Sequence, residues 1–280
     1  MAEIPVKRIL VADDDPLILE LIEHVLPPPE FSLTLAQDGA EALRQIQQKD
    51  FDLVLTDIWM PEMDGLELLR QAKQLKPDLR VIVMTADSTP ENVVRSIRNQ
   101  AHDYVAKPFS VTLLLEVVRA ALEAPAGEIE VLVAQPDWIE LRLPCELGAA
   151  QRVHRFLHEV KADLPQEVRE AVGTAFRELL TNAIEHGGGF DPKQKVSICY
   201  IRLKRMILYR ISDPGHGFHF DELAHAAVSN PPEEPLRHLE VREERQMRSG
   251  GFGILIARQV VDELLYNDKQ NEVVFVKYLD

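Results

Sequence analysis

The sequence has few of the features that mark secreted, membrane-spanning or disulfide-bonded proteins. It has two cysteines, Cys145 and Cys199, which lie far apart and lack the spacing of a metal site, so we expect small core residues rather than a disulfide. No stretch approaches about 18 uninterrupted apolar residues, and residues 1–7 lack the apolar region of a secretory signal. We therefore predict a cytoplasmic protein that makes no membrane contact of its own.

Basic residues are also in short supply. The 31 lysines and arginines are outnumbered by 46 acidic residues, which gives a formal charge of −15 over 280 residues. Residues 1–124 have 12 basic and 21 acidic side chains, and the rest of the chain has 19 and 25. Neither half offers the positive surface that nucleic-acid binding requires, so we expect a protein or nucleotide partner and no nucleic acid. The length allows two ordinary domains.

The first half of the chain alternates short apolar runs with amphipathic helical patterns. Five such units predict a parallel sheet that is covered by helices on both faces. Sites in these sheets form beyond the carboxyl ends of the strands. The expected strands are residues 6–12, 32–36, 51–56, 80–85 and 103–106, and the expected helices are 16–26, 39–48, 65–76, 90–100 and 111–123.

Acidic and basic side chains follow several of these strands at their carboxyl ends. Asp13 and Asp14 come after the first strand and Asp57 ends the third. Three carboxylates at one sheet edge repel each other unless a cation lies among them, so we predict a Mg²⁺ site here. Thr85 ends the fourth strand, and Lys107 follows the fifth.

This arrangement, together with the segment 60–65, resembles the receiver domain of two-component response regulators over residues 1–124. The resemblance implies a doubly wound, five-stranded parallel sheet of the flavodoxin-like type, and an upstream histidine kinase as the phosphodonor. It also implies a role for each site residue: Asp57 accepts the phosphoryl group, Asp13 and Asp14 bind Mg²⁺ with it, Lys107 pairs with phosphoryl oxygens, and Thr85 and Tyr104 report the modified state.

The second half is organised around a helical pattern that contains Glu178 and Asn182. Apolar residues gather on one side of this helix, and these two residues lie one turn apart on the other side. Glu178 offers a carboxylate base, and Asn182 offers a neutral oxygen for a hard cation such as Mg²⁺. The same spacing also occurs on ordinary solvated helix faces. The glycines at 187–189 are expected to end the helix.

Two glycine-rich segments follow this helix and favour the functional interpretation. Asp213 to Phe218 comes after an apolar strand at 206–211, and Gly250 to Gly253 precedes a helical pattern at 254–265. Glycines in such places let backbone N–H groups approach phosphates closely. The predicted strands at 129–134, 138–143, 196–203, 206–211 and 273–278 form a mixed sheet backed by helices on one face, an α/β sandwich.

The helix and the two glycine-rich segments resemble the three nucleotide-binding boxes of the GHKL ATP-binding superfamily. Residues 135–280 are most similar to the anti-sigma factor serine kinases, with 125–134 as a linker and first strand. By this resemblance Glu178 is the general base, Asn182 holds Mg²⁺, and Asp213 binds the adenine amino group. The further ATP-binding residues implied are His186, Gly215, Gly217, Gly250, Gly251 and Gly253.

The two resemblances together predict a response regulator whose output is an ATP-dependent serine/threonine kinase. The implied substrate is an anti-sigma factor antagonist, with a sigma factor as an alternative partner. Two rival interpretations stay open: a switch that binds ATP and a partner without phosphotransfer, and a histidine kinase with His158 as acceptor. The hairpin at 129–143 either docks the two halves or makes a homodimer. Arg245, Arg248 and Ser249 are candidates for phosphate contacts or residues of a solvated helix.

Overall fold

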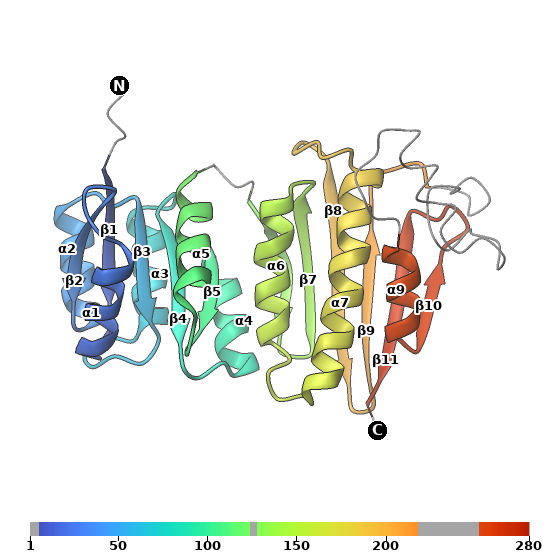
Figure 1. The fold of residues 1–280 in the computed structure, drawn as a ribbon, viewed down its shortest axis with the longest axis horizontal. Helices are drawn as coiled ribbons and strands as arrows, with labels where there is room; N and C mark the ends of the chain where they lie inside the picture. The colour runs from blue at the N-terminus through green and yellow to red at the C-terminus, as the bar shows by residue number, and fades with distance from the viewer. Residues whose placement is uncertain (1–5, 124–127, 218–251, 280) are drawn as a thin grey trace. The chain divides into compact units, whose positions relative to one another are not determined.

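The computed structural model describes residues 6–123, 128–217 and 252–279 (Figure 1). The chain divides into two units. The first unit comprises Met1–Ala126 and Arg155–Ala162, and the second comprises Gly127–His154 and Asp163–Asp280.

The first unit contains a parallel sheet with the strand order β2-β1-β3-β4-β5. The strands are β1 Lys7–Ala12, β2 Phe31–Ala36, β3 Leu53–Asp57, β4 Arg80–Thr85 and β5 Asp103–Ala106. The helices are α1 Pro16–Val25, α2 Gly39–Gln48, α3 Gly65–Leu75, α4 Pro90–Arg98 and α5 Val111–Glu123. The predicted flavodoxin-like fold is confirmed.

The apolar strands explain this arrangement. Every residue of β3 is buried, as expected of a strand with helices on both of its faces. Figure 1 shows α1 and α5 on one face of the sheet, where Ile22 and Val117 pack against strand residues such as Leu55. The core therefore fixes the carboxyl ends of β1, β3 and β4 beside one another.

Several acidic residues of the first unit serve as helix caps rather than as site residues. Asp15, Asp38 and Asp64 accept hydrogen bonds from backbone N–H groups in the first turns of α1, α2 and α3, at 2.9, 2.6 and 2.7 Å. Such caps satisfy backbone donors that a helix leaves unpaired. Their carboxylates are thus already engaged in holding the fold.

The second unit contains a six-stranded sheet with the order β10-β11-β9-β8-β7-β6. Its strands are β6 Glu130–Gln135, β7 Trp138–Pro144, β8 Lys195–Leu203, β9 Met206–Ser212, β10 Glu263–Tyr266 and β11 Glu272–Tyr278. Its helices are α7 Gln166–Asn182 and α9 Gly253–Val260, and α6 Leu147–Glu159 belongs to this unit as far as His154. Figure 1 shows α7 and α9 on the same face of the sheet, the expected α/β sandwich.

Two details of the second unit differ from expectation. All strand pairs described in its sheet are antiparallel, so the predicted mixed sheet is wrong. Short hairpin turns, at 136–137 and 204–205, reverse the chain where a parallel pair would need a long crossover. The helix expected over 254–265 ends at Val260, because Asp262 accepts a hydrogen bond from Tyr278 N at 2.6 Å and aligns β10 along β11.

The core of the second unit is aromatic. The ring centroid of Tyr209 lies 5.0 Å from that of Phe176 on α7 and 4.9 Å from that of Phe275 on β11. Both cysteines are buried and free, as predicted. This packing fixes α7 on the sheet, and α7 positions the residues of the predicted nucleotide site.

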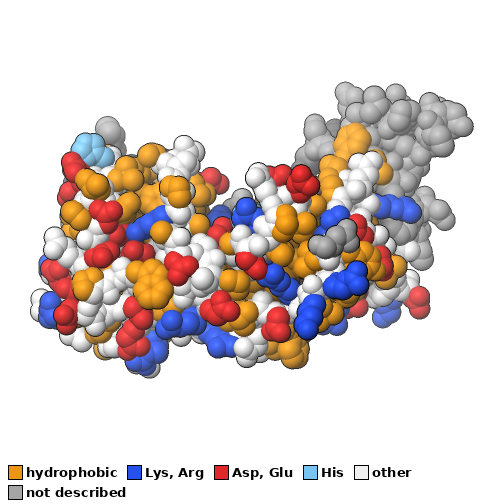
Figure 2. Space-filling view, turned by 90° about the horizontal axis from the view of Figure 1, so that it is seen from below, with side chains coloured by type: hydrophobic (Ala, Val, Ile, Leu, Met, Phe, Trp, Pro, Cys, Tyr) orange, Lys and Arg blue, Asp and Glu red, His pale blue; other side chains and the backbone are white. Residues whose placement is uncertain are grey.

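The charge distribution on the surface bears on the predicted absence of a nucleic-acid partner, and the helix lengths bear on membrane contact. On the face seen in Figure 2, acidic and basic side chains of the described residues are mixed rather than gathered into one basic surface. No helix within residues 6–123, 128–217 and 252–279 combines the length and the apolar character needed to cross a membrane.

Candidate functional site

Three carboxylates meet at the carboxyl edge of the first sheet. Oxygens of Asp13, Asp14 and Asp57 all lie within 4.8 Å of one another. Asp13 and Asp57 are buried at the ends of neighbouring strands, and Asp14 is exposed. Carboxylate oxygens are the ligands that Mg²⁺ prefers, and an exposed member leaves room for water ligands. The residues present therefore fit the predicted Mg²⁺ site.

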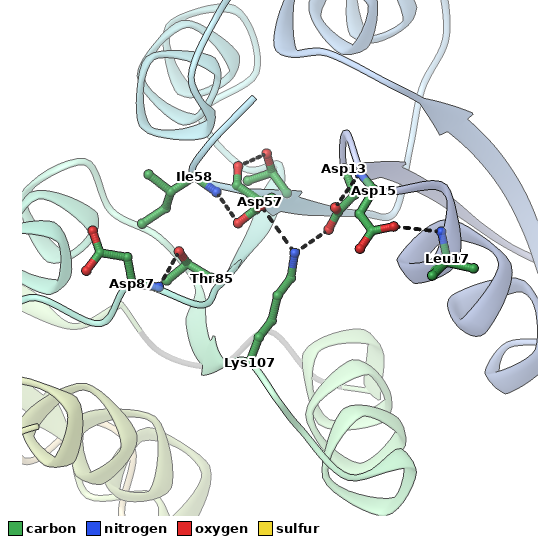
Figure 3. A network of polar contacts seen from close by, with 9 residues as sticks. Asp13, Asp15, Leu17, Asp57, Ile58, Thr85, Asp87 and Lys107 are labelled. Atoms are coloured by element: carbon green, nitrogen blue, oxygen red, sulfur yellow. Dashed lines mark hydrogen bonds and ion pairs between the residues drawn. The ribbon is translucent and has the colours of Figure 1, made fainter. Parts of the chain in front are cut away.

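Lys107 lies against this cluster from the end of β5 (Figure 3). Its Nζ is 2.6 Å from Oδ2 of Asp13 and 3.2 Å from Oδ2 of Asp57. Burial raises the pKa of Asp13 above its ordinary value, and the Lys107 ammonium opposes that shift. Ile58 N donates to Oδ1 of Asp57 at 2.7 Å, which orients Oδ2 towards the lysine. The site thus holds Oδ2 of Asp57 beside the Lys107 ammonium, whose positive charge would offset the negative charge of a phosphoryl group on that oxygen.

The two predicted switch residues occupy different places in the first unit. Thr85 is fully buried at the end of β4, and its Oγ1 accepts a hydrogen bond from Asp87 N at 3.2 Å (Figure 3). Tyr104 is buried within β5, two residues before the end of that strand. Burial raises its pKa well above the ordinary value. The phenol is therefore neutral at physiological pH.

In the second unit, Glu178 and Asn182 on α7 lie against the first residue of α9. A Cβ atom at Gly253 would lie 2.9 Å from Glu178 Oε2 and 3.3 Å from Asn182 Nδ2. The Glu178 side chain is 32% exposed, with Arg177 Nε 3.7 Å from its Oε1. The fold brings together the predicted base, the predicted Mg²⁺ ligand and a helix N-terminus, which favours anions.

Asp213 lies where β9 ends, against the turn that continues α7. A Cβ atom at Gly187 would lie 2.3 Å from Asp213 Cγ, and Gly215 N donates to Asp213 Oδ1 at 2.8 Å. Burial raises the pKa of this carboxyl group. The glycines keep side chains away from a carboxylate whose second oxygen can accept a hydrogen bond.

The remaining predicted ATP-binding residues divide into described and undescribed ones. His186 lies in a single π-helical turn, Ala183–Gly187, that continues α7. Gly217 has a φ of +82°, and a Cβ atom there would lie 1.5 Å from Lys269 O, so only glycine fits. The residues that lie outside the described part of the chain are Phe218, Arg245, Arg248, Ser249, Gly250 and Gly251.

Sequence reasoning missed two residues that shape this site. Asn271 joins β11 to the Asp213 segment: its backbone O accepts from Asp213 N at 2.9 Å, and its Nδ2 donates to Gly215 O at 3.1 Å. Cys145 packs beneath Gly188, where a Cβ atom would lie 2.1 Å from its Sγ. Neither residue type has a spacing that would have revealed it, because both contacts join segments that are distant in sequence.

The two histidines of α6 have structural partners. His154 Nε2 lies 3.3 Å from Gly173 O, and its ring stacks on Phe176 with centroids 6.2 Å apart. His154 is therefore a packing residue of the second unit. His158 Nδ1 lies 3.0 Å from Glu159 Oε1.

Comparisons with known families agree with this geometry. Residues 9–119 match the response regulator receiver domain, and residues 143–277 match the histidine kinase-like ATPase domain. The chain joins a receiver domain to a histidine kinase-like ATPase domain. This receiver–ATPase fusion is 30% identical over 185 residues to the DNA-binding transcriptional regulator NtrC of Bradyrhizobium sp. The aligned region covers 66% of this chain and 38% of that protein.

Other similar proteins also match the receiver–ATPase fusion only in part. The transcriptional regulatory protein ZraR of Salmonella typhi is 39% identical over 204 residues, 71% of this chain and 45% of that protein. The fusion therefore spans less than half the length of these two relatives. A CheY-like receiver domain protein from Methanospirillum hungatei is 35% identical, with a TM-score of 0.42, over 42% of this chain and 95% of its own.

Proposed function

We propose that this chain is a response regulator whose ATPase domain is a serine/threonine protein kinase for an anti-sigma factor antagonist, controlled by phosphorylation of Asp57. The receiver domain implies an upstream phosphodonor such as a histidine kinase, and the ATPase domain implies ATP binding. The observation that supports the kinase most is the position of Glu178, beside Asn182 and the start of α9.

In the receiver, Asp57 Oδ2 is the proposed nucleophile. It forms a bond to the phosphorus of the donor while the donor's bond to that phosphorus breaks, which gives an acyl phosphate. Lys107, 3.2 Å from this oxygen, is placed to pair with the incoming phosphoryl oxygens. Asp13, Asp14 and Asp57 would hold Mg²⁺, which supplies positive charge against the phosphoryl oxygens.

In the ATPase domain, Glu178 is the proposed general base. Its carboxylate accepts the proton of a serine or threonine hydroxyl as that oxygen bonds to the γ-phosphorus of the substrate ATP and ADP leaves. Partial exposure lets a protein substrate reach it. Asp213 would accept from the adenine amino group, and Asn182 would hold a Mg²⁺ ion on the triphosphate of ATP.

Phosphotransfer from labelled ATP to candidate antagonist proteins tests this proposal. Intact wild type should label a partner serine or threonine in an acid-stable form, and Glu178→Gln should bind ATP without labelling it. Glu170→Gln is a matched control, since it lies on the same helix with its side chain exposed and bound by Gln166 Nε2 at 2.7 Å. ATP binding without any labelled partner would favour a binding switch instead, and an acid-labile, base-stable label would favour a histidine acceptor.

A further inference from the structure

A buried carboxylate in β5 has a partner from a distant part of the sequence. Asp103 is 2% exposed, and Arg155 Nε donates to its Oδ1 at 2.8 Å while Arg155 Nη2 donates to its Oδ2. Both residues belong to the first unit, which includes Arg155–Ala162. Two parallel hydrogen bonds between a guanidinium and a carboxylate are strong and fix orientation. We call this the Asp103–Arg155 clamp.

The residues next to the clamp also contact each other. The ring of Tyr104, the predicted switch residue, lies 6.1 Å from the ring of Phe156. Burial raises the pKa of Tyr104, and the carboxylates of Glu159, Asp87 and Asp57 add to that shift. Arg155 and Phe156 therefore lie against Asp103 and Tyr104 of β5.

Burial distinguishes this clamp from ordinary surface ion pairs. The pair between Arg119 and Glu30, also in the first unit, has side chains that are 53% and 47% exposed. Exposed pairs of this kind contribute little to stability. Removal of one partner from a buried pair is costly, because the remaining charge is left without compensation. Asp103 also accepts a hydrogen bond from Tyr104 N at 2.8 Å, and Arg155 supplies the positive charge that compensates the buried carboxylate and holds the segment against β5.

We propose that the segment Arg155–Ala162 transmits the effect of Asp57 phosphorylation from the receiver to the rest of the chain. The Asp103–Arg155 clamp holds this segment on the switch residue Tyr104. This inference rests on the proposed role of Asp57. In this scheme a change at Thr85 on phosphorylation reaches Tyr104 on the neighbouring strand β5, whose ring lies against Phe156. Arg155 is a positioning residue in this scheme. The segment is the end of α6, so its movement acts on a helix whose earlier residues belong to the second unit.

Reciprocity of coupling gives a test within the receiver itself. If Asp57 and the clamp are coupled, breaking the clamp must change the affinity of Asp57 for a phosphoryl analogue. We expect Arg155→Gln in the full chain to shift the affinity for beryllofluoride with Mg²⁺ about fivefold or more, in either direction. Arg119→Gln, which breaks the exposed pair, should leave it within about twofold.

A second measurement follows the segment directly. Beryllofluoride should change amide hydrogen exchange at residues 155–159 in wild type, and Arg155→Gln should abolish that change. If Arg155→Gln unfolds, the double variant Asp103→Asn/Arg155→Gln removes both charges and leaves none unpaired. Analogue affinity within about twofold of wild type in these variants, together with a beryllofluoride-induced change in exchange at 155–159 as large as in wild type, would overturn the inference.

These readouts need neither ATP nor a protein substrate. A chain that fails to label any partner protein can still show coupling between Asp57 and residues 155–159, and a failed coupling test leaves the kinase assay standing. Wild type that does not bind beryllofluoride would overturn both the role of Asp57 and this inference.

Discussion

Gly253 at the start of α9 lies directly against Glu178 on α7, so that a methyl group at Gly253 would come within 2.9 Å of Glu178 Oε2. We predict that Gly253→Ala displaces the end of this side chain without unfolding the domain, because alanine suits a helix better than glycine. A small misplacement of a catalytic group can cost about 100-fold in rate. Phosphotransfer should fall by that order, while ATP affinity, measured by calorimetry, changes less.

A matched control for this variant is Gly148→Ala. Gly148 also lies near the start of a helix, and a Cβ atom there would meet nothing within 4 Å. It should leave the transfer rate unchanged. An equal loss of rate in both variants would show that the contact with Glu178 is not the cause.

Lys107 is predicted to stabilise the receiver by compensating its buried carboxylates. Lys107→Met leaves Asp13 without the ammonium that now lies 2.6 Å from it. The free energy of unfolding without Mg²⁺ should fall by about 3 kcal/mol, the usual cost of an uncompensated buried charge. Saturating Mg²⁺ should recover part of the loss because it neutralises the same carboxylates. Urea denaturation with and without Mg²⁺ measures both effects.

The exposed pair of Lys76 and Asp50, with nitrogen and oxygen 2.6 Å apart, provides the comparison for Lys107. Lys76→Met should cost less than about 1 kcal/mol, with no response to Mg²⁺. Equal losses of unfolding free energy in Lys76→Met and Lys107→Met would argue against a cation-binding site at Asp13.

We predict that the Asp213 carboxylate lowers the stability of the fold near neutral pH and strengthens ATP binding. Burial raises its folded-state pKa above 3.8, so the folded protein binds this proton more tightly than the unfolded chain. The contribution of Asp213 to the free energy of unfolding is therefore greatest below pH 3.8, and it declines as the pH rises through the folded-state pKa. Asp213→Asn should be more stable than wild type near neutral pH, and this gain should vanish in acid.

The same substitution should weaken ATP binding. Loss of a hydrogen bond to a charged group costs about 1.5 to 3 kcal/mol, or roughly 10- to 150-fold in affinity. Calorimetric titration with ATP, beside denaturation curves at several pH values, checks both effects. Unchanged ATP affinity in Asp213→Asn would remove Asp213 from the adenine site.

The first unit could be predicted closely because local signals and topology agree there. Fully buried strands read as continuous apolar runs, and parallel strands bring their carboxyl ends to one edge, so Asp13, Asp57 and Lys107 could be placed together from sequence. The structure shows these three side chains in contact. Asp15 follows Asp13 and Asp14 directly in the sequence, but its side chain caps α1 and does not join their acidic cluster.

The second unit was harder to predict because its decisive contacts are non-local. Residues 263–266 have an apolar content that suits either a helix or a strand, and pairing with β11 decides for the strand. Asn271 and Cys145 act through contacts with the Asp213 and Gly188 segments. The clamp between Asp103 and Arg155 joins residues 52 positions apart, and neither residue signals the other in the sequence.

The central claim is that the receiver state controls phosphotransfer in the ATPase domain. The most direct measurement is the rate of phosphate transfer from ATP to an antagonist protein by the full chain, with and without beryllofluoride, in wild type and Asp57→Asn. The account predicts that beryllofluoride changes the wild-type rate by about fivefold or more and leaves the Asp57→Asn rate unchanged. A wild-type rate that is the same with and without beryllofluoride bound would contradict the account.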